Sequence, residues 1–367
     1  MLRLTNMTSR EALIALNMLP KIGPVRVRRL MDALGSAESI LTANINRLQS
    51  VSGIGPETAL VIREWESRID LSSELHDASQ RGVSIITQSD PHYPETLKQS
   101  YDPPLVLYVW GDVKEEDRHA LGIVGSRRCS HYGTHSARQF SFQLATCGFT
   151  IISGLARGID TYAHEGAIAA KGRTIAVIGS GIGQVYPPEN MGLAERIADG
   201  HGAVVSEFPL NTPPSKKTFP MRNRIVAAWS QAILVVECPA WSGALITANL
   251  AGEMGKSIYA VPGQIDRPTS AGCNNLIRDG AILVTGGQDI VDDLSVLPLQ
   301  DASLAVQMPA LEGAEQDIVT ALEEGAELMD EILAATRLPL PELSATLLKL
   351  EIMGVVQQLP GSRFARK

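Results

Sequence analysis

Two stretches of the chain decide its fold class: FTIISGLARGID at residues 149–160 and TIAVIGSGIG at residues 174–183. Each begins with a continuous apolar run, and each run ends in a turn that contains glycine. Strands buried on both faces have this pattern, because helices cover both sides of a parallel sheet. The two stretches therefore predict a doubly wound α/β domain.

Similar apolar runs extend this sheet in both directions along the chain. They lie at 121–125, 203–207, 232–237, 257–261 and 281–284, and helical stretches separate them. The run LVLYVW at residues 105–110 predicts one more strand. The prolines around it indicate that residues 76–115 are otherwise an extended connector.

The loops at the carboxyl ends of the strands are the candidate ligand site, because doubly wound sheets bind ligands there. The candidate residues in these loops are Gly125, Ser126, Arg127, Gly154, Arg157 and Gly158. Glycine lets a phosphate approach the backbone, the following helix adds partial positive charge, and arginine adds charge-assisted hydrogen bonds. Glycine also serves packing in such turns, but several of these loops on one sheet edge favour anion binding.

The segment KKTFPMRNR at residues 216–224 combines four cations with one aromatic ring. Cations such as Lys216 neutralise phosphates, and a phenyl ring such as that of Phe219 stacks on an unpaired base. Packing of Phe219 in the core is the alternative. The lysine pair before it and the proline after it favour a loop.

The ends of the chain predict two smaller domains. Residues 1–75 contain the repeat Ile22-Gly23-Pro24 and Ile54-Gly55-Pro56, each before an amphipathic helix. This resembles a SAM-like pair of helix–hairpin–helix units, whose turns can hold a phosphate; a purely structural helical domain is the alternative. Residues 76–298 form the predicted core domain, and residues 299–310 the linker. Residues 311–367 contain three short helical patterns and a hairpin pattern, which resemble a winged helix.

Charge is distributed unevenly along the chain. The total is −8, but residues 286–367 carry 14 acidic and 5 basic side chains. Within residues 118–180, seven side chains are basic and two are acidic. A basic surface on an acidic protein indicates a local anionic partner, with chance clustering on a solvated surface as the alternative.

Composition excludes several classes of protein. With 44% hydrophobic residues the chain is not disordered, and no apolar stretch approaches the length of about 18 residues that predicts a membrane span. The N-terminal residues lack the features of a signal peptide. The four cysteines form no C-x-x-C pair, which predicts neither disulfides nor zinc but buried thiols in a cytoplasmic protein.

Catalytic patterns are poor. His131 and His135 lack further metal ligands nearby, and Asp160 and His164 could pair or serve only as structural polar groups. A dinucleotide fingerprint would need glycine at position 184, where Gln184 stands. We therefore predict no metal, no cofactor and no catalytic residues.

Several motifs in a fixed order resemble the DprA/Smf family of DNA-processing proteins. They are Tyr93-Pro94, Asp102-Pro103-Pro104, Gly125-Ser126-Arg127, Gly154-x-Ala156-x-Gly158-Ile159-Asp160, Phe219-Pro220-x-Arg222-Asn223-Arg224, Ser242-Gly243-Ala244 and Val261-Pro262-Gly263. The resemblance covers residues 90–293. It implies a Rossmann-like core that binds single-stranded DNA, forms a homodimer, and loads RecA recombinase during natural transformation and recombination.

The resemblance also implies roles for single residues. Ser126, Arg127 and Lys216 would contact phosphate, Phe219 would stack on a base, and Arg222 and Arg224 would be ligands or local structural cations. Ser242 and Gly243 would line the same pocket. The helix at residues 341–353 has Glu342 and Glu351 against Lys349 alone, so duplex binding by the winged helix is in doubt and protein binding is the alternative.

The rival hypothesis is an enzyme that acts on a nucleotide. Related phosphoribohydrolase-like proteins carry P-G-G-x-G-T-x-x-E, whereas residues 239–247 here read PAWSGALIT. The double glycine and the glutamate are missing, which removes the catalytic group and leaves the pocket.

Overall fold

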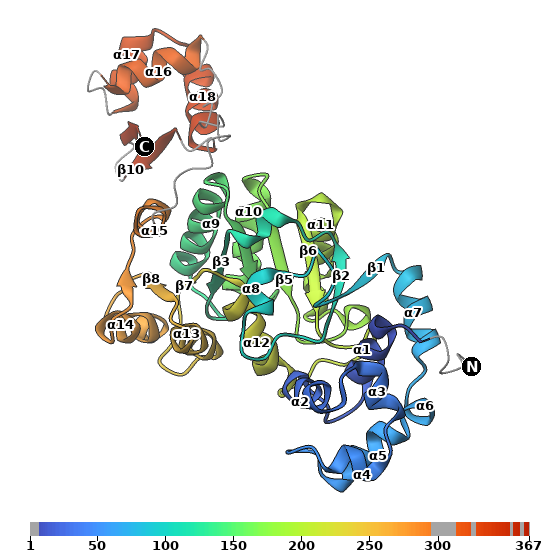
Figure 1. Cartoon of the computed structure of the whole chain (residues 1–367). Helices are drawn as coiled ribbons and strands as arrows, with labels where there is room; N and C mark the ends of the chain where they lie inside the picture. The colour runs from blue at the N-terminus through green and yellow to red at the C-terminus, as the bar shows by residue number, and fades with distance from the viewer. Residues whose placement is uncertain (1–6, 295–312, 324–327, 353–354, 360–362, 367) are drawn as a thin grey trace. The chain divides into compact units, whose positions relative to one another are not determined.

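A mixed nine-stranded sheet forms the centre of the first part of the molecule (Figure 1). Its order is β1-β2-β6-β5-β4-β3-β7-β8-β9. The strands are β1 (Val83–Thr87), β2 (Val106–Gly111), β3 (Ala120–Val124), β4 (Thr150–Ser153), β5 (Thr174–Val177), β6 (Gly202–Ser206), β7 (Ala232–Val235), β8 (Ser257–Ala260) and β9 (Ile282–Leu283). Strands β3 to β9 pair in parallel, as the continuous apolar runs predict.

The strand order reverses direction beside β3. From β3 the chain continues through β4 and β5 on one side, and later through β7 and β8 on the other. The carboxyl ends of β3 and β7 therefore flank a topological switch point, where sheets of this kind leave a crevice for a ligand.

The computed structural model describes residues 7–294, 313–323, 328–352, 355–359 and 363–366. It divides into two compact units, Met1–Ala302 and Ser303–Lys367. The predicted linker at residues 299–310 lies outside the described residues. No helix in the described part of the chain is long and apolar enough to cross a membrane.

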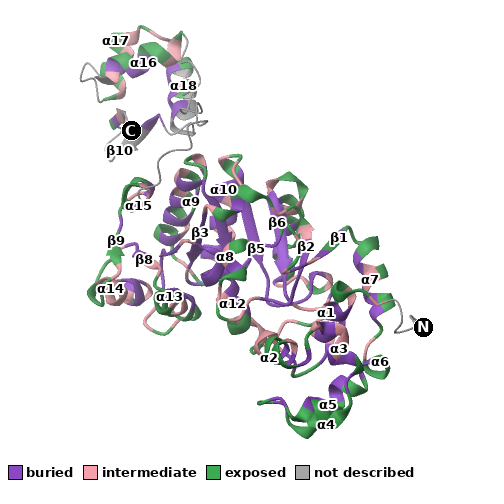
Figure 2. Ribbon diagram, in the orientation of Figure 1, coloured by how far each residue is buried: buried purple, intermediate pink, exposed green. Residues whose placement is uncertain are grey.

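Helices cover both faces of the sheet (Figure 1). One face packs against α9 (His131–Thr146), α10 (Ile159–Ala169) and α15 (Gly287–Asp293). The other packs against α8 (Glu95–Lys98), α12 (Thr218–Trp229), α13 (Gly243–Glu253) and α14 (Ala271–Arg278), while α11 (Met191–Arg196) joins the N-terminal core. The parallel strands β3 to β7 between these layers are buried along their whole length (Figure 2), which explains their lack of polar alternation.

The N-terminal repeat is helical, as predicted. Its helices are α1 (Ser9–Met18), α2 (Pro24–Leu34), α3 (Ala37–Thr42), α4 (Ile45–Gln49), α5 (Pro56–Arg63), α6 (Trp65–Arg68) and α7 (Leu71–Gln80). Gly23 and Gly55 cap α2 and α5, each with proline at the first helical position. The buried side chains of these helices share one core with Val106, Tyr108 and Val204 of the sheet.

Three expectations about the sheet and the thiols are wrong. Residues 76–115 are not mainly a connector, since they contain β1, which pairs antiparallel with β2, and β2 pairs antiparallel with β6. The last strand, β9, is exposed rather than buried, because it lies at the edge of the sheet. Of the four free cysteines, Cys238 and Cys273 are buried, but Cys147 is exposed beyond the end of α9.

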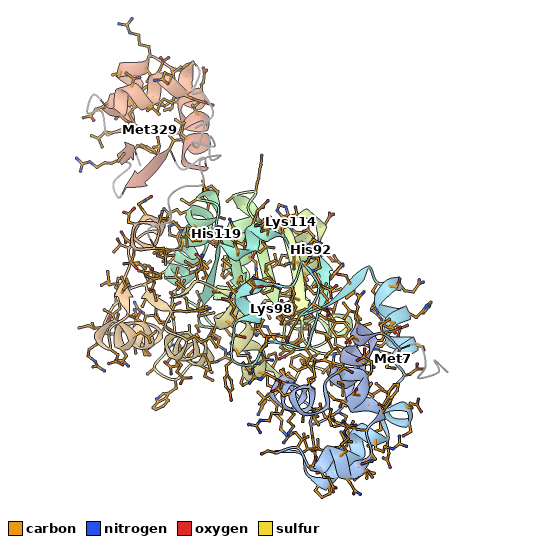
Figure 3. All side chains as sticks on the ribbon, viewed as in Figure 1. Met7, His92, Lys98, Lys114, His119 and Met329 are labelled. Atoms are coloured by element: carbon orange, nitrogen blue, oxygen red, sulfur yellow. The ribbon has the colours of Figure 1, made fainter. Side chains whose placement is uncertain are left out.

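Ion pairs lie at the edge of the sheet where the parallel strands begin. Lys114 (Figure 3) pairs with Asp112 at 3.2 Å, just after β2. Arg173, immediately before β5, holds the buried carboxylate of Asp117 through Nε at 2.8 Å. These charges lie at the edge of the sheet opposite the switch point, so we assign them to stability.

The second unit has the predicted helices and hairpin. The helices are α16 (Ala314–Glu323), α17 (Met329–Thr336) and α18 (Leu340–Ile352). The strands β10 (Val356–Leu359) and β11 (Arg363–Arg366) pair antiparallel as a wing. Ile318, Ile332, Leu347 and Phe364 belong to a core within this unit, which has the architecture of a winged helix.

Candidate nucleic-acid interface

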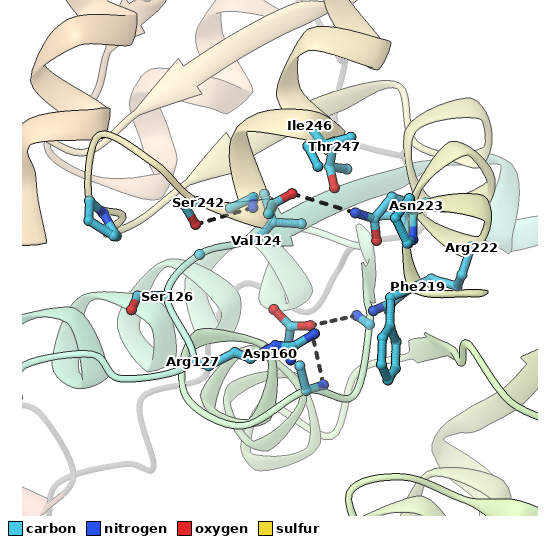
Figure 4. Close-up of a pocket in the computed structure, with 18 of the residues that line it drawn as sticks. Val124, Ser126, Arg127, Asp160, Phe219, Arg222, Asn223, Ser242, Ile246 and Thr247 are labelled. Carbon is cyan, nitrogen blue, oxygen red and sulfur yellow. Dashed lines mark hydrogen bonds between the residues drawn. The ribbon is translucent and has the colours of Figure 1, made fainter. Parts of the chain in front are cut away.

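A cavity of about 670 Å³ lies at the switch point of the sheet. Its walls come from the loops after β3, β4 and β7 and from the first turns of α12 and α13 (Figure 4). The structure brings these predicted site residues together there: Gly125, Ser126, Arg127, Gly154, Lys216, Phe219, Arg222, Ser242 and Gly243. Residues from four separated parts of the sequence thus form one pocket.

The loop after β3 is fixed by backbone hydrogen bonds. Ser126 N donates to Glu237 O at 2.7 Å, and Ile159 N donates to Ser126 O at 3.1 Å. The Ser126 hydroxyl accepts from the backbone N–H of Arg128 at 3.1 Å. The loop is therefore held in place while the side chains of Arg127 and Arg128 stay exposed at the pocket.

Gly158 shapes this loop from beneath and does not line the cavity. Its φ is +75°, and a Cβ there would lie 2.3 Å from the carbonyl oxygen of Ser126. Only glycine lets the loop after β4 approach the loop after β3 this closely. The close approach assigns Gly158 a packing role, and its direct contact with DNA stays a prediction.

Arg222 is a buried cation in the wall of the pocket. Only 5% of the residue is exposed, and its Nη1 donates to Val177 O at 2.7 Å. Gly154 makes room for it, because a Cβ at that position would overlap the guanidinium. These contacts favour a structural cation, one of the two roles that the sequence left open, and a DNA contact by Arg222 stays a prediction because Arg222 also lines the pocket.

Asp160 supplies the negative charge that faces Arg222. Its Oδ2 accepts from Gly154 N at 3.1 Å and from Ala156 N at 3.2 Å. Burial raises the pKa of Asp160, whereas Arg222 and these N–H groups oppose that rise. Burial likewise lowers the pKa of Arg222, and Asp160 opposes the change.

Phe219 lies in the first turn of α12 rather than in a loop, because the helix begins at Thr218, just before it. The prediction of a loop from Lys216-Lys217 and Pro220 is wrong, since proline is accepted in the first turn of a helix. The Arg127 guanidinium lies 5.1 Å from the centre of the Phe219 ring, within reach of a cation–π interaction. The Tyr186 ring lies 5.8 Å away, tilted by 46°.

A smaller hollow adjoins the pocket and shares Phe219 with it. Arg127, Phe219 and Arg222 line both hollows, and Arg157 and Tyr186 line only the smaller one. Arg157 forms an ion pair with Glu189, which raises the pKa of Arg157 and lowers that of Glu189. Both side chains are about half exposed, so this pair is open to exchange with another anion.

Arg224 lies outside both hollows. It pairs with Glu207 and with Asp102, and it also donates to the carbonyl oxygen of Asp102 at 2.6 Å. Its side chain is only 12% exposed. These contacts favour the alternative of a structural cation, and a DNA contact by Arg224 stays a prediction.

Asp160 and His164 do not pair with each other. The His164 ring is buried, and its Nδ1 lies 2.7 Å from Thr174 Oγ1. Because that hydroxyl donates to Ile151 O, it accepts from His164, which places the imidazole proton on Nδ1. Burial lowers the pKa of His164 to about 3.

We expect His164 to make the unfolding free energy depend on pH. Below pH 6.5 the His164 side chain is protonated in the unfolded chain, whereas in the folded chain it is protonated only below about pH 3. The free energy of unfolding therefore falls as the pH falls through this range. At pH 5 the loss is about 2 kcal/mol. Urea unfolding at pH 7 and pH 5 should show a smaller difference in His164→Gln, whereas the exposed control His92→Gln should match the parent.

Sequence reasoning missed several residues of the pocket. They are Arg128, Asp160, Asn223, Trp241, Thr247 and Thr269. Arg128 follows Arg127 directly and was a visible signal. Thr247 belongs to the Ser242-Gly243-Ala244-Leu245-Ile246-Thr247 run, but its direction toward the pocket depends on where α13 begins. Within the described ranges, no group of three His, Cys, Asp or Glu side chains could hold a metal ion.

Comparisons with protein families match all three parts of the chain. The family described as DNA recombination-mediator protein A matches residues 84–295. The DprA winged helix domain matches residues 303–362, and the SAM-like helix-hairpin-helix tandem matches residues 13–65.

Individual relatives agree. Protein Smf of Synechocystis is 34% identical over 94% of this chain and 96% of its own length. The DNA processing protein DprA of Bacillus subtilis is 41% identical over 59% of this chain and 72% of its own.

Two solved structures resemble the fold. DNA processing protein A from Streptococcus pneumoniae gives a TM-score of 0.68 at 32% identity and covers 78% of this chain and 98% of its own. The Helicobacter pylori protein, described for its single-stranded DNA binding mode, gives 0.52 at 29% identity and covers 58% and 96%. Since the recombination-mediator match spans more than half of the chain and a relative above 30% identity spans nearly all of it, the chain belongs to the DprA/Smf family of DNA-processing proteins.

Proposed function

We propose that this chain is a recombination mediator that binds single-stranded DNA in the pocket at the switch point. The observation that carries the proposal is the contact between the Arg127 guanidinium and the Phe219 ring inside that pocket. Binding a single strand without sequence preference needs a cation for the phosphate and an aromatic face for the base, side by side.

The charges of the pocket suit a phosphate backbone. Arg127, Arg128 and Lys216 are exposed there, and Asp160 is the one carboxylate that lines the cavity within the described residues. Asp160 is buried and engaged with two backbone N–H groups, so it repels an incoming phosphate little. The surface that DNA would meet is thus positive although the whole chain is acidic.

We also propose that the pocket binds DNA without chemistry. A hydrolytic site needs an acid or base near the reacting atoms, and Asp160 is committed to the loop after β4. The test is to measure binding of an oligonucleotide by fluorescence polarisation and to assay turnover of nucleotides in the same samples. Turnover that Asp160→Asn abolishes would support the rival enzyme.

The remaining parts of the proposal follow from family membership. They are a homodimer, loading of RecA recombinase, and a role in natural transformation and recombination in the cytoplasm. Light scattering of the purified chain tests the dimer. RecA filament assembly on a single strand, with and without this chain, tests loading.

We expect single strands to bind more tightly than a duplex of equal length. A duplex stacks its bases internally and hides the faces that Phe219 would contact. Direct competition between the two forms, at one salt concentration, measures the preference. A chain that ends at Ala302 should keep it, because the pocket lies in the first unit. Equal or tighter duplex binding by the full chain would move the site to the hairpin repeats or the wing.

A further inference from the structure

Trp241 is the most exposed aromatic side chain at the pocket. Its exposure is 95%, whereas Trp65 and Trp229 are buried and Trp110 is partly buried. Tryptophan is highly buried on average, so leaving a whole indole in water is unusual. One exposed apolar side chain is not by itself a site. The position of Trp241 makes it a candidate binding residue, because it lines the cavity at the switch point.

The loop between β7 and α13 carries Trp241 to the rim of the cavity. Ser242 follows it and caps α13, its hydroxyl accepting from Ala244 N at 3.3 Å. Gly243 is exposed, and no atom lies within 4 Å of the place where its Cβ would be. The backbone around Trp241 is therefore fixed by the helix cap, while the space beside it stays open.

The Phe219 ring has aromatic and cationic neighbours, and the Trp241 ring has none among the described residues. Arg127 and Tyr186 already contact Phe219. Among the described residues, the Trp241 indole makes no hydrogen bond, ring contact or cation contact. An indole whose faces are open at a positively charged cavity is suited to stack on an unpaired base.

Phe219 and Trp241 lie at different parts of the site. Phe219 lines both hollows, whereas Trp241 lines only the larger one, and Arg157 and Tyr186 line only the smaller one. Figure 4 shows Ser242, next to Trp241 in sequence, on a different side of the cavity from Phe219. Arg127 and Lys216 line the same cavity, so it also offers cations for the phosphates of a strand.

We infer that Trp241 forms a second base subsite, which holds a neighbouring nucleotide of the same strand. The subsite rests on the proposed function, since it extends the path of the strand from Phe219 toward α13. It takes any of the four bases, because stacking uses the ring face that every base presents.

The test compares Trp241→Ala with Trp241→Phe in the full chain. The probe is a labelled oligothymidylate of about 16 nucleotides, the upper end of common site sizes. We expect Trp241→Ala to weaken binding by about 5-fold to 150-fold, the range that stacking of one base gives. Trp241→Phe should retain most of the affinity, and neither variant should change the salt slope, since no charge is removed.

Two controls separate stacking from other effects. Ile265→Ala truncates a side chain that is 98% exposed and does not line the cavity, so it should bind like the parent. A strand of the same length without bases should bind the parent and Trp241→Ala equally. The part of the tryptophan fluorescence that Trp241→Phe removes adds a direct signal, because stacking on a base should quench it and protect it from acrylamide.

The outcomes distinguish this inference from the proposed function. If the parent binds the oligothymidylate but Trp241→Ala binds equally well, or if acrylamide still reaches Trp241 in the complex, the subsite is overturned and the proposed function stands. If the parent does not bind the oligothymidylate, both are overturned.

Discussion

Arg222→Met should lower the free energy of unfolding of the first unit by about 3 kcal/mol or more at pH 7. Methionine keeps most of the length of the side chain but removes the cation that faces Asp160 and donates to Val177. Removing one partner of a buried charge pair leaves the other uncompensated, which costs about 3–5 kcal/mol. Urea unfolding followed by tryptophan fluorescence measures the change, since all four tryptophans lie in the first unit.

The loss should shrink as the pH falls. Burial holds the pKa of Asp160 above its unfolded value, so its protonated form stabilises the folded state at low pH and this contribution is lost as the pH rises. Without Arg222 the pKa of Asp160 rises further. The loss of unfolding free energy is therefore largest at pH values where Asp160 is charged in the unfolded chain. Arg128→Met, at an exposed arginine of the same pocket, should change stability by no more than about 0.5 kcal/mol. A pH-independent loss would mean that packing, not charge, explains the effect.

Phe219→Ala should weaken single-strand binding by about 1–3 kcal/mol, the amount that stacking of one base contributes. The slope of log affinity against log salt should stay nearly unchanged, because the substitution removes no charge. Phe219→Tyr keeps the ring and should restore most of the affinity. Titration of one oligonucleotide at several salt concentrations measures both quantities.

Arg127→Ala and Lys216→Ala should behave in the opposite way. Each should flatten the salt slope by about 0.7, the value for one phosphate of a single strand, and weaken all sequences alike. Arg138→Ala is the matched control, since Arg138 is exposed, pairs with Glu165 and does not line the pocket. The division of labour is refuted if Phe219→Ala flattens the slope as much as Arg127→Ala does, or if neither cation variant flattens it.

The parallel part of the sheet could be predicted from sequence because its strands are buried on both faces. Continuous apolar runs such as LGIVG at 121–125 and TIAVIG at 174–179 leave few alternatives, and the glycine turns after them mark the ligand edge. The same turns led to Ser126, Arg127 and Gly154, which the structure places at the pocket.

The surroundings of Arg222 and Arg224 and the position of β1 could not be predicted, because they depend on contacts between residues that are distant in sequence. Arg222 and Arg224 look alike in sequence, two residues apart on one helix, yet each has partners elsewhere in the chain: Arg222 faces Asp160 and donates to Val177, and Arg224 pairs with Glu207 and Asp102. Strand β1 was missed because its neighbours Gln88 to Asp90 and the nearby prolines resemble a connector, and antiparallel pairing with β2 overrides that local signal.

The core shared by the N-terminal helices and the sheet has a consequence for how this molecule opens. Leu16 and Leu30 of the helical repeat are buried in one cluster with Tyr108 of β2 and Val204 of β6. A repeat with its own core could detach as an independent foldon, whereas this one cannot leave without exposing the sheet. We therefore expect the amides of α1 and β2 to exchange with solvent through a common opening. A partner that binds the repeat therefore contacts helices that are packed against β2 and β6. The repeat supports the sheet and is not a separate module.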